Sequence, residues 1–147
     1  MKRRLFLKSA MASSAVATAV GAGLLTPKII FAASDSFKAT SDATVSAASA
    51  AAKGTFKFKA PKIAENGAVV PVSVDATNLN DVTNISFLVQ TNNTPLAGSF
   101  NFAGALGFVS TRIKMGKTSP VTAVVTSGGS VSAITSEIKV TVGGCGG

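Results

Sequence analysis

The chain has 147 residues, of which 46% are hydrophobic, and its 14 Lys and Arg against six Asp and Glu give a formal net charge of +8. It contains one Cys and no His, Trp or Tyr. Without His, neither a Ser-His-Asp nor a Cys-His catalytic arrangement can form, and a single Cys cannot build a Cys-rich zinc, iron–sulfur or covalent haem site. The six carboxylates are widely spread, so we expect no catalytic residue, no metal site and no enzymatic activity of the chain's own.

The first 32 residues follow the plan of an export signal. A cationic start precedes an apolar stretch from about Ala10 to Leu25, and small residues follow at Ala32-Ala33. The pattern of twin-arginine signals is matched by five residues, Arg3, Arg4, Phe6, Leu7 and Lys8. We therefore expect residues 1–32 to be a twin-arginine signal peptide that sends the folded protein to the periplasm. A membrane anchor is the weaker alternative, because the stretch is rich in Ala, Gly, Ser and Thr.

Most of the positive charge belongs to this signal. Five of the 14 basic residues lie within residues 1–32, which leaves nine basic against six acidic residues and a net charge of +3. No clustered basic sequence remains, so we expect neither nucleic-acid binding nor, after cleavage, a membrane association. One Cys excludes an internal disulfide, and the core alone must stabilise about 115 residues, a length that suits one domain.

Residues 33–53 are rich in Ala, Ser and Thr and predict a linker or a short helix. Ser41 or Asp42 is a suitable N-cap, and Gly54 would end such a helix after Ala52. Val45 is its one large apolar residue, so we expect the segment to dock weakly.

From residue 54 to residue 142 the apolar residues alternate, as in β-strands with one buried face. Val70, Val72 and Val74 share one face of a strand, in which Pro71 favours an edge position or a bulge. The other stripes are Phe56 and Phe58, Ile85 with Phe87 and Val89, Phe100 and Phe102, Val109 with Ile113 and Met115, and Ile134 with Ile138, Val140 and Val142. Seven or so short strands separated by turns predict an antiparallel, immunoglobulin-like β-sandwich whose core consists of these stripes.

The last five residues are predicted to form a flexible arm, because four glycines surround the cysteine: Gly143, Gly144, Cys145, Gly146 and Gly147. Packing does not explain a cysteine at such a position, which points to a chemical use of its thiol. The terminal carboxylate two residues away disfavours the thiolate, so activation must come from other proteins. Three residues from Val142 to Cys145 give a reach of about 10 Å.

Three segments together resemble the SoxY family, a subunit of the periplasmic SoxYZ carrier of thiosulfate oxidation. They are residues 60–67 leading into residues 69–72, residues 109–113, and residues 137–147. The resemblance implies that Cys145 carries sulfur intermediates covalently, thiosulfate-derived groups and a persulfide, with no other cofactor. It also implies a heterodimer with a SoxZ-like second subunit, which would be exported on this chain's signal.

Further partners are implied by the same resemblance. A haem-containing protein would join thiosulfate oxidatively to the thiol, a hydrolase would release sulfate, and a sulfur dehydrogenase, where present, would oxidise the remaining sulfane sulfur. Two alternatives from other classes stay open. One is a structural or adhesive β-sandwich with an intermolecular disulfide through Cys145. The other is a ubiquitin-like sulfur carrier activated at the C-terminal Gly146-Gly147 as a thiocarboxylate, which needs ATP.

Overall fold

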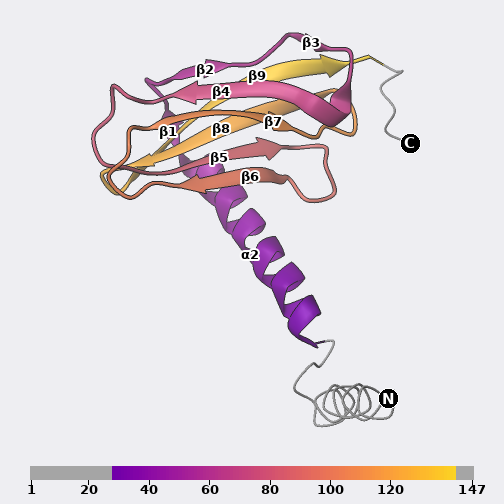
Figure 1. The fold of residues 1–147 in the computed structure, drawn as a ribbon, viewed down its shortest axis with the longest axis horizontal. Coiled ribbons are helices and arrows are strands. Elements are labelled where there is room, and N and C mark those ends of the chain that lie inside the picture. Colours follow the sequence, from indigo (N-terminus) through magenta and orange to yellow (C-terminus); the bar gives the residue numbers. More distant parts are fainter. Residues whose placement is uncertain (1–27, 142–147) are drawn as a thin grey trace, which may run out of the picture. The chain divides into compact units, whose positions relative to one another are not determined.

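The computed structural model describes residues 28–141, and of residues 28–34 the backbone only. The chain divides into two compact units, residues 1–39 and residues 40–147. Helix α2 (Lys28–Ala50) begins in the first unit and continues into the second, which contains every described strand (Figure 1). Between residues 28 and 141, no helix is both long and apolar enough to cross a lipid bilayer.

The second unit is a β-sandwich of two sheets. The larger, sheet A, has the order β1 (Ala52–Lys53), β9 (Ser130–Val140), β8 (Ser119–Ser127), β5 (Val82–Val89) and β6 (Leu96–Asn101), and β3 (Ile63–Ala64) also pairs with β9. The smaller, sheet B, has the order β2 (Lys57–Lys59), β4 (Val70–Asp75) and β7 (Phe108–Ile113). A short 3₁₀ turn, η1 (Gly67–Val69), leads into β4. The predicted antiparallel sandwich is confirmed.

Two short strands depart from the antiparallel expectation. β1 and β3 each have two residues, and both run parallel to β9, with Ala52 opposite Ser132 and Ile63 opposite Lys139. They raise the strands of the described chain to nine, against the seven or so expected. Two residues are too few to show a period of two, which is why the sequence pattern did not predict them.

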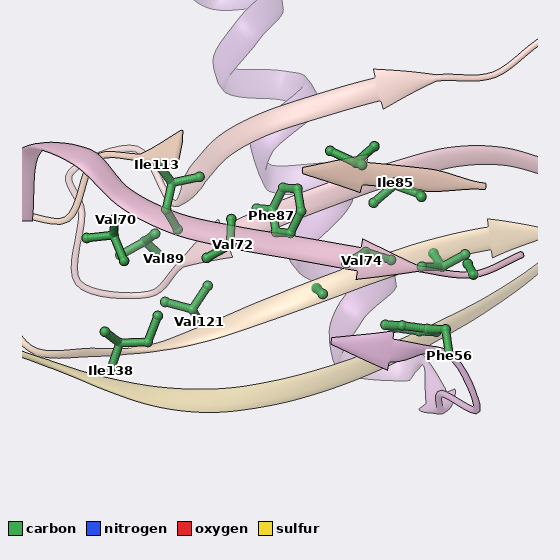
Figure 2. Close-up of a cluster of buried hydrophobic side chains, with 14 of the residues drawn as sticks. Phe56, Val70, Val72, Val74, Ile85, Phe87, Val89, Ile113, Val121 and Ile138 are labelled. Atoms are coloured by element: carbon green, nitrogen blue, oxygen red, sulfur yellow. The ribbon is translucent and has the colours of Figure 1, made fainter. Parts of the chain in front are cut away.

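The space between the sheets is filled by the predicted apolar stripes (Figure 2). Phe87 and Ile85 from β5 face Val72 and Val74 from β4, and all four are buried. The Phe87 ring packs against Phe100 at a centroid distance of 6.2 Å and an interplanar angle of 81°, an edge-to-face arrangement. Fully burying each such side chain contributes about 1.5–3 kcal/mol, so the stripes are the main source of stability.

Pro71 lies in the middle strand of sheet B, not in an edge strand. The pairing of β2 with β4 ends where Lys59 meets Ser73, however, so Pro71 lies beyond the end of β2 and pairs with Arg112 of β7 alone. The position is therefore edge-like locally, which suits a residue that cannot donate a backbone hydrogen bond.

The predicted short helix differs from the observed one at both ends. Helix α2 extends from Lys28 to Ala50, through the predicted cleavage position after residue 32, and ends before Gly54. Ser41 is not an N-cap but a buried residue inside the helix, and its Oγ accepts a hydrogen bond from Leu96 N at 3.2 Å. The strand at the sheet's edge supplied a partner that local sequence could not reveal.

The weak docking expected for this helix stays a prediction, but the structure shows where the helix contacts the sheet. Val45 and Ala48 of α2 pack against a second apolar cluster on the outer face of sheet A, formed by Leu88, Leu96 and Val124. All three strand residues are buried. The sheet supplies the large side chains and the helix supplies small ones, so the helix sequence alone does not indicate where the contact lies.

Candidate functional site

The predicted site residues lie beyond the part of the chain that the structure describes. Cys145 and its four glycines follow Thr141, the last described residue, and the export residues Arg3, Arg4, Phe6, Leu7 and Lys8 precede Lys28. The structure does describe the strand that leads toward Cys145 and the contacts of its last described residues. We call its last described residues, Lys139, Val140 and Thr141, the arm root.

One side of the arm root is hydrogen-bonded to the segment that contains β3. Lys139 N donates to Lys62 O at 3.0 Å, and Thr141 N donates to Ala64 O at 3.1 Å. The Thr141 hydroxyl donates to the carbonyl oxygen of Glu65 at 3.4 Å. A strand end at a sheet margin would otherwise expose these groups to solvent, so the short parallel pairing fixes the point from which the C-terminal residues depart.

On its other side, the arm root is hydrogen-bonded to the side chain of one threonine, Thr118. Val140 N donates to Thr118 Oγ1 at 3.0 Å, and the same hydroxyl donates to Val140 O at 3.4 Å. Thr118 lies in the loop that precedes β8. Its side chain thus satisfies both backbone groups of Val140 just beyond the last β8–β9 pair, Ser119 with Ile138.

Gly67 allows the close packing beneath the arm root. Met115 N donates to Gly67 O at 2.7 Å. A Cβ on Gly67 would overlap Met115 O and would lie 3.0 Å from Val140 Cγ1. Any larger residue would push the β7 end or the arm root away, so this position requires the absence of a side chain.

The charged groups at the arm root are exposed and of mixed sign. Lys62, Glu65 and Lys139 all lie at the surface. Among residues 28–141, no three His, Cys, Asp or Glu side chains gather in a way that could hold a metal ion. The described part of this site therefore offers a fixed support for the C-terminal residues.

A distinct electrostatic feature lies on sheet B. Asp75 accepts hydrogen bonds from Thr77 Oγ1 at 2.7 Å and from Thr77 N at 3.2 Å. These bonds, with the positive charges of Lys57 and Lys59 nearby, hold the pKa of Asp75 below its ordinary value.

The arm-root contacts were not predicted from the sequence. Thr118 and its partner Val140 are 22 residues apart in the chain. Glu65 and Thr141 are separated by 76 residues. The pairing of β3 with β9 brings Glu65 close to Thr141, and the pairing of β8 with β9 brings Thr118 close to Val140. No local pattern signals either contact.

Comparisons with known proteins agree with this fold. A family model described as sulfur oxidation protein SoxY matches residues 41–145, a range that begins at the buried Ser41 and ends at Cys145. Among solved structures, the chain is similar to the sulfur carrier protein SoxY from Chlorobium limicola f thiosulfatophilum, with 41% identity, a TM-score of 0.53, and coverage of 61% of this chain and 83% of that chain. No curated protein matched. Since the family match covers well over half of its residues, the chain belongs to the SoxY family of sulfur oxidation proteins.

Proposed function

We propose that the chain is a periplasmic carrier that holds sulfur intermediates covalently on the Cys145 thiol and presents them to separate enzymes. The observation that carries this proposal is the family match through Cys145, which stands between glycine pairs just beyond a firmly held strand. The carrier itself performs no catalysis in this proposal.

The geometry of the arm root supports such a role. Hydrogen bonds hold the chain up to Thr141 on one side and up to Val140 on the other, so the reach of Cys145 is measured from a fixed point. Four residues span at most about 14 Å when fully extended. The sandwich can therefore stay outside an enzyme while the thiol enters a narrow channel, which the absence of side chains on the four glycines makes possible.

The first proposed step loads the carrier. The Cys145 thiolate and the outer sulfur of thiosulfate form an S–S bond, and two electrons pass to a haem-containing partner protein, which is reduced. The product is a cysteine S-thiosulfonate, and no atom other than the thiol proton leaves.

The next proposed step releases sulfate. A hydrolase adds water to the terminal sulfonate group and breaks its S–S bond, so that sulfate and two protons leave and a cysteine persulfide remains. Where a sulfur dehydrogenase is present, it oxidises the outer sulfur with three waters, withdrawing six electrons and six protons. A second hydrolysis then regenerates the Cys145 thiolate.

The remaining parts of the proposal concern location and assembly. A twin-arginine signal in residues 1–32 would export the chain in folded form together with a SoxZ-like second subunit as a heterodimer. An exported carrier meets thiosulfate and its oxidising partners in the same compartment, which is why the signal supports the function.

Intact-mass measurement tests the carrier role. The chain with its second subunit is incubated with thiosulfate and the haem-containing partner, and a reductant-labile S-thiosulfonate adduct is expected on the wild type. The adduct should be absent from Cys145→Ser. An adduct that persists on this variant, or a wild type that is an obligate disulfide dimer with no free thiol, would overturn the proposal.

A further inference from the structure

The outer face of sheet B carries a concentration of positive charge. In β4 and β7 the residues Val70, Val72, Val74, Val109 and Ile113 are buried, so the alternate residues point outward. The register places Lys59 beside Ser73 and Ser110, and Arg112 beside Pro71. We define the cationic face as the four exposed basic residues on this side: Lys57, Lys59, Arg112 and Lys114.

One carboxylate on the face opposes these four charges. Asp75 lies opposite Lys57, but its oxygen already accepts two hydrogen bonds from Thr77. The centre of the face is slightly hollow, with an open groove of about 270 Å³ that Lys59, Ser73 and Ser110 line together with apolar residues, Ala60, Pro61, Pro71 and Val72. The exposure of the four basic side chains means that no described element covers them.

The cationic face is continuous with the arm root. Lys114 directly precedes Met115, whose backbone N–H donates to Gly67 O, and Gly67 packs against Val140. A protein seated on this face would therefore lie beside the point from which the C-terminal residues depart. An enzyme that takes up the Cys145 thiol must approach the carrier at this end.

We propose that the cationic face docks the acidic rim of an enzyme whose channel receives the arm. This inference rests on the proposed carrier function. Permanent interfaces contain few lysines, whereas charge-rich surfaces steer short-lived encounters. A carrier that visits several enzymes in turn needs the second kind. Complementary Asp and Glu side chains around the channel entrance would supply the opposite charge.

Charge reversal tests the docking face. The doubly substituted Lys59→Glu and Arg112→Glu variant, together with its second subunit, is compared with the wild type in loading by the purified haem-containing enzyme. At low ionic strength we expect kcat/KM to fall by about tenfold, because both substitutions act on association. Salt near 0.5 M should remove most of the difference, since it screens exposed charges.

Lys53→Glu is the control, and the single variants Lys59→Glu and Arg112→Glu are its matches in charge. Lys53 is exposed on β1, at the edge of sheet A, and its reversal makes the same change in charge at one site. We expect its kcat/KM to stay close to that of the wild type, and prolonged incubation with excess enzyme should load all variants completely. A doubly substituted variant that loads as fast as Lys53→Glu would overturn the docking proposal.

The other outcomes are also decisive. If no adduct forms on the wild type, the carrier function fails; if all variants load at equal rates, the docking face alone fails. Loss of the second subunit from the doubly substituted variant in gel filtration would assign the face to that subunit and overturn the proposal. Tighter binding to duplex DNA or to phosphatidylglycerol vesicles than to the enzyme would overturn it as well.

Discussion

The outer faces of the two sheets differ sharply, although both sheets share one interior. The outer face of sheet A carries Leu88, Leu96 and Val124, which Val45 and Ala48 of helix α2 cover. The outer face of sheet B carries lysine, arginine and serine side chains and one phenylalanine, Phe108, that remain exposed. The difference teaches that the number of buried faces sets the sequence pattern of a strand: β4 alternates between buried and exposed residues, whereas β8 has five consecutive buried residues.

The largest loss of stability that distinguishes the two outer faces is expected when a large side chain covered by the helix is removed. Leu88→Ala should lower the free energy of unfolding by about 2–3 kcal/mol, because it deletes a buried side chain and leaves a cavity. The matched change on the outer face of sheet B, Ser110→Ala, should stay within about 0.5 kcal/mol. Denaturant unfolding measures both. Equal effects would mean that α2 does not bury the outer face of sheet A.

A smaller loss of stability is expected when the hydrogen bond between helix α2 and β6 is removed. Ser41→Ala removes the acceptor for Leu96 N and leaves a buried donor unsatisfied, which should cost about 1–3 kcal/mol. Ser49→Ala, at an exposed position two turns further along the same helix, is the control. Its effect should be near zero because the Ser49 hydroxyl bonds to Val45 O within the helix. Amide hydrogen exchange at Leu96 gives a second readout. Unchanged protection there in Ser41→Ala would contradict the observed bond.

The smallest expected effect on stability comes from the negative charge of Asp75, on the outer face of sheet B. Because the pKa of Asp75 is lowered in the folded chain, the ionised carboxylate stabilises the fold at pH values well above 3.8. This contribution disappears as the pH falls below 3.8 and through the lower pKa of the folded state. The difference in unfolding free energy between the wild type and Asp75→Asn should therefore shrink on acidification.

A Thr77 variant tests the cause of the lowered pKa of Asp75. The hydroxyl of Thr77 is the largest cause of the lowered pKa, so Thr77→Val should reduce the pH-dependent difference while leaving the charge in place. Denaturant unfolding at a series of pH values, from neutral to below 3.8, measures this difference in unfolding free energy. A difference between the wild type and Asp75→Asn that is constant across this range would exclude a stabilising role for the ionised carboxylate.

The sequence predicted the sandwich wherever a strand has one buried face. The alternation of Val70, Val72 and Val74 places all three in the core, and the Gly128-Gly129 turn adopts the positive φ values that favour glycine. The stripe through Ile85, Phe87 and Val89 was equally clear. The sequence did not predict the burial of Leu88. That burial depends on a helix whose own side chains are small and whose position is set by tertiary packing.

The candidate site likewise has one part that the sequence predicts and one part that it does not. Cys145 and its glycines stand out because their composition is unusual for any packed segment, and the family match extends to that cysteine. The arm root could not be predicted, because it depends on a two-residue parallel pairing of β3 and on one hydroxyl of Thr118. Contacts between residues so far apart in the chain have no local signature.

The pairing of β9 also has a mechanical consequence. An enzyme that draws the C-terminal residues into its channel pulls on the end of β9 along the direction of the strand. Nine residue pairs join β9 to β8, and their hydrogen bonds run across the strands, so such a force shears all of them at once instead of peeling them one by one. The fold can therefore resist traction at its C-terminal end without opening its core.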